Sequence, residues 1–478
     1  MILLDGTSLR CADVHAISTG SQVRLCPHAM ERMEKNSQQV PEGPEVLESK
    51  RRWLLGNEDG HMPGDLVRTF ILGHCAGVGD PFPKSIVRAA MASRANVLAS
   101  GCTGSRPVAA QTLARMINKG VIPVVPSQGS VGAAGDLAPM AHIARTACGY
   151  SEMELGFQPL HPTQKEALAL INGVSVSAAI AAVALSRARR VFDAAQWAAA
   201  MTMEAVRAQS QCLDARAIRL RGHPDAERVG SRLRLLLEGS SRVSADRRPD
   251  AFSIRCGPSV MGAVLRSLDF VETEVDRELN SASDNPLLLD GEWIEAGNFH
   301  GASIGMAMDH MKTALSQLAT LSERRTFRLT HGKLSNDLPS FLVRGSGLNS
   351  GFMLAQYTAA ALASETKGLS HPASADSIPT VQHHEDHVSM APIAGRMALE
   401  SIECVADIVA IELLLSAQAL DLRRMEDGNP PPEKLAWLHG RIREKVAFWE
   451  DDEVLHPAIS ALSEMVRGGE LSEAAEGW

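Results

Sequence analysis

The stretch RMALESIECVADIVAIELLLSAQALDLRR, residues 396–424, decides the fold class of this chain. It continues for more than twenty residues without glycine or proline, and basic residues stand at its C-terminal end. Apolar residues recur on more than one helical face, which is typical of a helix surrounded by other helices. We therefore expect a long buried helix here.

Other stretches repeat this pattern, and glycine, proline or asparagine bounds each of them: 174–206, 257–281, 301–326 and 352–369. Few segments alternate between apolar and polar residues, the pattern that indicates strands. Together these features predict an all-α fold built on a long-helix bundle, whose sites form on facing helices and on the turns between them. We expect an N-terminal region over 1–200, a central bundle over 201–426 and a C-terminal helical tail over 427–478.

Composition excludes several classes of function. The 478 residues are 45% hydrophobic and 22% charged, which suits a soluble globular protein with a large core. A net charge of −9 offers no basic face, so we expect no nucleic-acid partner. The N-terminus lacks the apolar run of a secretory signal, and no apolar run is long enough to span a bilayer. A cytoplasmic protein with no membrane partner is the expectation, and its eight scattered cysteines favour reduced thiols.

A second informative stretch is GSVGAAGDLAPMAH, residues 129–142. Gly129, Gly132 and Gly135 recur every three residues and predict a tight backbone turn of the kind found at reactive sites. Ala133 and Ala134 stand at its centre, and neither side chain carries a nucleophile, acid or base. The turn therefore resembles a reactive loop that lacks its reactive group.

Taken with this loop, a series of blocks resembles the aromatic amino acid lyase family, and most closely its histidine ammonia-lyase branch. The blocks follow the family's order along about the whole chain: HCAGVGDPFP (74–83), RANVLASGCTGSRP (94–107), KEALALING (165–173), FSIRC (252–256), NSASDNPLL (280–288), GNFHG (297–301), LSERR (321–325), LNSGFMLAQYTAAALASE (348–365) and HPASADSIPT to EDHVSM (371–390). The resemblance implies an all-helical homotetramer, active sites assembled from several subunits, and a small amino-acid-like carboxylate as substrate.

In that family an Ala-Ser-Gly tripeptide cyclises into a methylidene-imidazolone, the electrophile that allows ammonia to leave. The serine hydroxyl is eliminated to form the exocyclic methylene, whereas here the tripeptide is Ala133-Ala134-Gly135. An alanine methyl has no leaving group, so we expect neither this prosthetic group nor another cofactor. Two further departures agree: Phe252 replaces a family tyrosine that serves the group, and SKRRWLLGNEDG (49–60) lacks the family's catalytic tyrosine. Three such changes favour natural divergence over one inactivating substitution.

Several matching residues predict a retained binding pocket. Arg255 corresponds to the family arginine that pairs with the substrate carboxylate, and a guanidinium suits that task because it donates two parallel hydrogen bonds. A structural ion pair inside the bundle is the alternative for it. Asn172 and Asn298 correspond to family asparagines near the substrate, although asparagine beside glycine is also a common turn former. His74 stands where the histidine branch has histidine, which indicates a polar or imidazole-like substrate group, with simple packing as the alternative.

The segment QHHEDH, residues 382–387, departs most from the family pattern. Glu385 matches a family glutamate near the substrate, while His383 and His384 replace residues that are commonly Asn-Gln. A carboxylate beside an imidazole predicts an acid/base pair for catalysis. Metal ligation is the alternative interpretation, but neighbouring positions point in different directions, so we expect no metal site.

Three hypotheses follow. The first is a lyase- or isomerase-type enzyme that works by acid/base chemistry without the electrophile, with Arg255 holding the substrate and Glu385 or His384 moving a proton. The second is a catalytically silent homologue that binds a ligand or partners an active paralogue. The third is an inactivated histidine or aromatic ammonia-lyase. The segment 37–65 bears on the choice, because Arg51, Arg52 or Glu58 could replace the missing tyrosine if this loop closed over the pocket.

Overall fold

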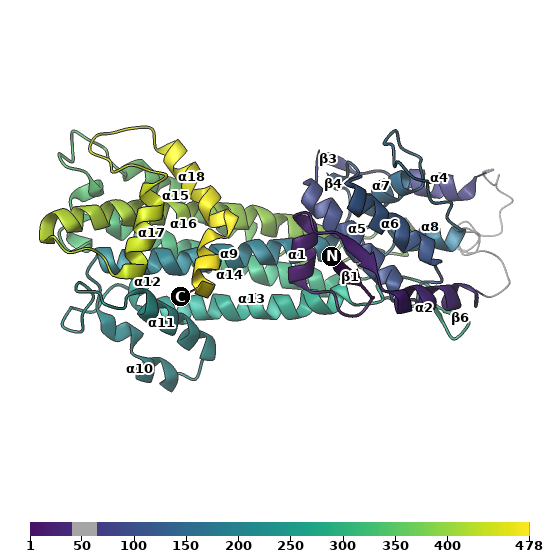
Figure 1. The fold of residues 1–478 in the computed structure, drawn as a ribbon, viewed down its shortest axis with the longest axis horizontal. Coiled ribbons are helices and arrows are strands. Elements are labelled where there is room, and N and C mark those ends of the chain that lie inside the picture. Colours follow the sequence, from purple (N-terminus) through teal and green to yellow (C-terminus); the bar gives the residue numbers. More distant parts are fainter. Residues whose placement is uncertain (41–64, 478) are drawn as a thin grey trace. The chain divides into compact units, whose positions relative to one another are not determined.

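The computed structural model describes residues 1–40 and 65–477, and the chain forms two compact units, each made from three segments of sequence. Unit 1 comprises residues 1–186, 271–309 and 372–396, and unit 2 comprises residues 187–270, 310–371 and 397–478. Figure 1 shows a predominantly helical chain with a few short strands. The all-α prediction is confirmed, while the division at residues 200 and 426 stays a prediction.

Four long helices contribute residues to both units: α9 (Ser175–Ala205), α13 (Gly257–Leu279), α14 (Ala302–Thr330) and α16 (Ala391–Asp427). Together with α15 (Met353–Leu369) they confirm the five predicted long helices. Within unit 2, the consecutive α16 residues 408–411 are all fully buried. Because four successive residues cover every side of a helix, α16 is enclosed on all sides there, as its apolar pattern predicts.

Unit 1 holds the N-terminal elements and every strand found among residues 1–40 and 65–477. Its helices are α1 (Cys11–Ser18), α2 (Pro27–Ser37), α4 (Leu66–Gly73), α5 (Lys84–Ala99), α6 (Pro107–Lys119), α7 (Leu137–Ala147) and α8 (Gln164–Ile171), with short turns η4 (Ala373–Ala375) and η5 (Val381–His383). The strands pair in twos: β1 (Ile2–Leu4) is parallel to β2 (Val23–Leu25), β3 (Val78–Pro81) is antiparallel to β4 (Pro126–Gln128), and β5 (Leu287–Leu289) is antiparallel to β6 (Glu292–Ile294). No larger sheet forms among the described residues.

Unit 2 adds shorter helices to its parts of the long ones: η1 (Ser210–Leu213), α10 (Ala215–Leu220), α11 (Pro224–Leu236), α12 (Phe252–Arg255), η2 (Gly332–Leu334), η3 (Ser340–Leu342), α17 (Glu433–Arg443), α18 (Leu455–Gly468) and α19 (Glu470–Gly477). The last three lie within residues 427–478, and the assignment of this segment as a separate tail stays a prediction. None of the helices in the described ranges is both long and apolar enough to cross a bilayer.

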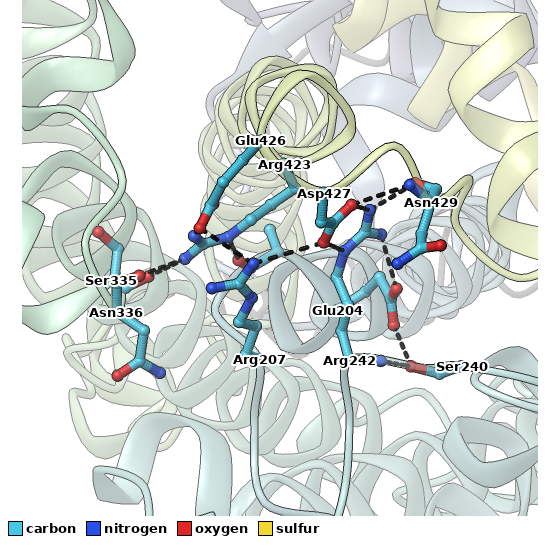
Figure 2. A network of polar contacts seen from close by, with 11 residues as sticks. Glu204, Arg207, Ser240, Arg242, Ser335, Asn336, Arg423, Glu426, Asp427 and Asn429 are labelled. Atoms are coloured by element: carbon cyan, nitrogen blue, oxygen red, sulfur yellow. Dashed lines mark hydrogen bonds and ion pairs between the residues drawn. The ribbon is translucent and has the colours of Figure 1, made fainter.

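A buried group of charges in unit 2, which we call the Arg242 cluster, joins the C-terminal ends of α9 and α16 (Figure 2). Arg242 is almost fully buried, and its Nη1 lies 2.9 Å from Glu204 Oε1 and its Nη2 2.8 Å from Asp427 Oδ1. The cluster also includes Arg423, whose Nε donates to the Ala205 carbonyl at 2.8 Å. The hydrogen bonds from Arg242 hold the pKa of Asp427 well below its usual range. Each charged side chain thus has a partner of opposite sign or a backbone acceptor.

Candidate active site

The candidate site in unit 1 is centred on residues 129–136, which we call the glycine loop, between β4 and α7. Gly132 and Gly135 have φ values of 71° and 85°, in the left-handed region that favours glycine. A Cβ atom added at Gly135 would lie 2.2 Å from the Gly173 carbonyl oxygen. The tight turn predicted from the glycine spacing therefore exists, and it depends on glycine for both conformation and space.

Gly173, which follows α8, holds the centre of the glycine loop through main-chain bonds. Its N–H donates to the Ala134 carbonyl at 3.1 Å, and its carbonyl accepts from the Asp136 N–H at 2.8 Å. Ala133 is buried beside Val388 and Met390, whereas Ala134 is half-buried. The side chain of residue 134 takes no part in these bonds, so the loop backbone is held without a hydrogen bond from that side chain.

Two serines support the same loop. Ser389 Oγ donates to the Gly132 carbonyl at 3.0 Å, and Ser130 Oγ donates to the Gly135 carbonyl at 3.3 Å. The Met390 N–H also donates to the Val131 carbonyl at 2.9 Å. The glycine loop is thus fixed by partners from within it and from more than 250 residues further along the chain.

Asp136 ends the loop in a fully buried position. Its Oδ2 accepts from the Ser177 N–H at 2.7 Å, and its Oδ1 accepts from the Ser177 hydroxyl at 2.8 Å. Burial raises the pKa of this carboxyl from 3.8 to about 6, although the hydrogen bonds from Ser177 act in the opposite direction. Asp136 is therefore a carboxylate whose charge is costly to keep beneath the loop.

Asn172 lies within a buried charged group behind the loop. Its Nδ2 donates to Asp284 Oδ1 at 3.1 Å and to the Asn285 carbonyl at 2.9 Å, and Lys165 Nζ donates to Asp284 Oδ2 at 2.6 Å. Arg94 Nη1 donates to the Asn172 carbonyl at 2.5 Å. The amide nitrogen of Asn172 therefore serves this network, while its Oδ1 is buried with no hydrogen-bond partner in the described part of the chain.

The other predicted binding residues of unit 1 have local partners. His74 is half-buried at the end of α4, and its Nδ1 lies 2.7 Å from the Phe70 carbonyl, with the two rings 4.4 Å apart. Asn298 is exposed, and its Nδ2 lies 3.5 Å from the Ala282 carbonyl. These contacts of His74 are thus both with a residue of α4, and that of Asn298 is with a residue 16 positions earlier in the chain.

The predicted acid/base residues lie on an exposed turn. Glu385 is half-buried and Thr380 donates its hydroxyl to Glu385 Oε2 at 2.7 Å, while His383 and His384 are exposed. Gln382 and His383 have φ values of 52° and 67°, so the turn around η5 keeps an unusual backbone. No group of three or more His, Cys, Asp or Glu side chains suitable for a metal ion occurs in residues 1–40 and 65–477.

A pair of histidines was not predicted from the sequence. His300 Nε2 lies 3.2 Å from His387 Nδ1, and the two rings stack with centroids 5.2 Å apart. His387 is exposed within this chain, and His300 is half-buried. His300 belongs to the GNFHG block and His387 to the QHHEDH segment. The two histidines are 87 residues apart in the chain, and nothing in either block indicates that they pair.

In unit 2, Phe252 and Arg255 occupy the single turn of α12. Phe252 is 72% exposed, a large value for an aromatic side chain, and Arg255 is also exposed. Arg255 forms no ion pair with any residue that the structure describes. The structural ion pair weighed for Arg255 is thus absent from the described ranges. Arg51, Arg52 and Glu58 lie outside the described residues.

These features define an all-α protein of long helices with a glycine-bounded loop held by backbone bonds. The chain matches the family model "Aromatic amino acid lyase" over residues 59–444. It is 39% identical to a histidine ammonia-lyase of Gloeobacter violaceus, across 99% of this chain and 97% of that protein.

Solved structures agree with this match. The crystal structure of histidine ammonia-lyase from Trypanosoma cruzi has a TM-score of 0.89 and 34% identity, covering 100% of this chain and 95% of that one. A tyrosine aminomutase of Streptomyces globisporus has a TM-score of 0.89 at 30% identity, covering 100% of this chain and 98% of that one. The chain belongs to the aromatic amino acid lyase family.

Proposed function

We propose that this family member is a lyase- or isomerase-type enzyme that acts on a small amino-acid-like carboxylate without the methylidene-imidazolone group. The observation that carries this proposal is alanine at position 134, inside a loop whose backbone bonds are independent of that side chain. The fold and the loop are retained while the atom that the electrophile requires is missing.

The residues of the loop do not fit the prosthetic group. Formation of the group needs a hydroxyl on the central residue, because loss of that hydroxyl creates the exocyclic methylene. Ala134 carries a methyl group, so cyclisation between Gly135 N and the Ala133 carbonyl carbon would release one water and leave a saturated substituent. We therefore propose no catalytic step through this group and expect no other cofactor.

Arg255 is the proposed carboxylate-binding residue. Its exposure and its lack of an ion pair among the described residues leave the guanidinium available for a ligand. A planar guanidinium can donate two parallel hydrogen bonds to a substrate carboxylate. Phe252, exposed three residues earlier in the same turn of α12, would offer an aromatic surface.

Glu385 is the proposed proton-transfer residue, with His384 or His383 as its partner. The hydrogen bond from Thr380 orients one oxygen of Glu385, and a carboxylate has a second oxygen for a substrate proton. Without an electrophile, removal of a weakly acidic β-proton with loss of ammonia is disfavoured. The proposed reaction therefore expels a better leaving group than ammonia or adds a nucleophile to an unsaturated acid.

The remaining proposals concern specificity and assembly. His74, Asn172 and Asn298 are proposed to line the substrate pocket, and His74 together with the histidine ammonia-lyase relatives favours an imidazole-like substrate group. The family resemblance favours a cytoplasmic homotetramer, in which Arg255 and Glu385 of different copies contribute to one site.

The experiment that tests this proposal is incubation with histidine, urocanate, phenylalanine and related unsaturated acids, followed by untargeted mass spectrometry. We expect a product with the native protein and at least a hundredfold slower formation with Arg255→Ala, because the substrate carboxylate loses its anchor. Arg216→Ala is the matched control, since Arg216 is exposed and paired only locally with Asp214. Absence of any product, with ligand-dependent stabilisation that Arg255→Ala lacks, would instead identify a catalytically silent binding protein.

A second candidate is an ammonia-lyase inactivated at its prosthetic loop, and the 39% identity to histidine ammonia-lyases favours it. It predicts that the double substitution Ala134→Ser and Phe252→Tyr produces histidine deamination. Deamination in that variant, with no reaction of the native protein on any other acid, would support this candidate over the first.

A further inference from the structure

Unit 2 contains a cavity of about 330 Å³ that none of the predicted site residues lines. Its walls come from α9, α11 and α13, and its charged lining includes three arginines, Arg189, Arg228 and Arg232. Phe192 and Leu265 also line it, and both are buried. The cavity therefore combines cationic groups with an apolar wall, as small-ligand sites do.

Two of the three arginines are already paired. Arg189 Nη2 and Arg228 Nη1 each lie 2.8 Å from a different oxygen of Asp269, and Arg228 also reaches Asp225 at 3.1 Å. Burial tends to raise the pKa of Asp269, but the hydrogen bonds from the two arginines outweigh it and lower the pKa. These charges are largely compensated within the protein.

Arg232 is different. Its guanidinium lies 5.2 Å from the centre of the Trp197 ring, which positions it from one side. Its Nη2 is buried and has no hydrogen-bond partner in the part of the chain that the structure describes. Burial lowers the pKa of Arg232, and the charge of Asp193 only partly opposes this effect. A buried N–H donor without an acceptor is costly, so an anionic ligand beside Arg232 would be stabilised.

We propose that this cavity binds a small monocarboxylate with an apolar body, the carboxylate on Arg232 and the body against Phe192 and Leu265. A planar carboxylate can accept from the guanidinium of Arg232. Asp193 on the cavity wall and Asp269 between the paired arginines repel a second negative charge, which disfavours a phosphate dianion. The cavity volume is at the small end of the range for ligand pockets and suits a ligand of benzoate size.

The test is calorimetric titration with benzoate of the Arg255→Gln protein, in which the proposed active-site carboxylate anchor is removed. We expect saturable binding in this background and at least tenfold weaker binding after a further Arg232→Gln change. Arg266→Gln is the matched control, because it removes the same charge from α13 at a side chain that is 72% exposed and not part of the cavity wall. It should leave benzoate affinity unchanged.

A second variant keeps the test independent of the packing of Arg232 on Trp197. Leu265→Phe enlarges a buried side chain of the wall, so it should exclude benzoate while leaving every arginine in place. No benzoate binding in the Arg255→Gln protein, equal weakening by Arg266→Gln, or undiminished binding in both Arg232→Gln and Leu265→Phe would overturn the proposal. Tighter binding of inorganic phosphate than of benzoate would overturn the assignment to a monocarboxylate.

Discussion

The glycine loop and the Arg242 cluster both contain buried polar groups. Main-chain hydrogen bonds hold the centre of the loop, whereas side-chain ion pairs hold the cluster. In the glycine loop the bonds that fix Ala134 join main-chain atoms of Ala134, Asp136 and Gly173. In the Arg242 cluster the bonds join side chains, such as Arg242 to Glu204 and Asp427. We therefore expect exchange of the side chain at position 134 to have little effect on the fold, and loss of a charged side chain from the Arg242 cluster to have a large one.

The largest effect on stability should come from the cluster. Arg242→Met leaves Glu204, which is fully buried, without its counter-ion, and we expect a loss of about 3–5 kcal/mol in the free energy of unfolding. Urea denaturation followed by circular dichroism measures it. Arg216→Met removes an exposed ion pair as the control and should cost less than about 1 kcal/mol. Equal losses of unfolding free energy in Arg242→Met and Arg216→Met would show that the buried cluster stabilises the fold no more than an exposed ion pair does.

A backbone change in the loop should have the next largest effect. Gly135→Ala places a Cβ 2.2 Å from the Gly173 carbonyl oxygen at a φ of 85°, and we expect a loss of about 2–5 kcal/mol, combining about 1–2 for the positive φ with about 1–3 for the clash. Gly120→Ala has a similar φ of 70° but nothing within 4 Å. Gly120→Ala should therefore lose only the stability that the positive φ costs, about 1–2 kcal/mol. Equal losses of unfolding free energy in the two variants would refute the close packing of Gly135 on Gly173.

The buried carboxyl group of Asp136 should make the free energy of unfolding depend on pH. The pKa of Asp136 is raised from 3.8 to about 6, so the neutral form is favoured in the folded state. The stability that this preference provides is fully present below about pH 3.8 and is lost as the pH rises through about 6, by about 3 kcal/mol in total. Unfolding measured between pH 4 and pH 7 should show this decline in the native protein. Asp136→Asn should lack it, and parallel curves would contradict the assignment.

The smallest effect on stability should come from position 134, where the family carries the serine that forms the electrophile. Ala134→Ser adds one hydroxyl to a half-buried side chain that makes none of the bonds holding the loop, and we expect a change within about 0.5 kcal/mol. Thermal unfolding of the native and substituted proteins measures it. A loss comparable with that of Gly135→Ala would mean that residue 134 supports the fold after all.

The sequence predicted the long helices well because their apolar residues face other helices on several sides. The ends of the helices were predicted less accurately. Helix α16 begins at Ala391, five residues before the expected start at 396. Pro392 is tolerated because it lies in the first helical turn, and Gly395 lies inside the helix. A Cβ at Gly395 would lie 2.8 Å from an Ile180 side-chain atom, so this glycine allows close helix packing within unit 1 rather than ending a helix.

The site was predicted only in part, for a physical reason. Motifs identified Ala134, Arg255 and Glu385 as candidates, but not the partners that hold their surroundings. Asp136 and Ser177 are 41 residues apart, and Gly132 and Ser389 are 257 residues apart. Such pairs are brought together by tertiary packing, and neither member carries a local pattern that marks the other.

Whether residues 133–135 form the family electrophile is measured by mass spectrometry of the peptide that contains residues 129–142, from the native protein and from Ala134→Ser, with and without borohydride treatment. The native peptide should lose no more than one water and gain no hydrogen on borohydride treatment. The serine variant should lose two waters and become reducible, because serine supplies the hydroxyl that Ala134 lacks. Loss of two waters from residues 133–135 of the native protein, or reduction of these residues by borohydride, would contradict the proposal that this enzyme works without the family electrophile.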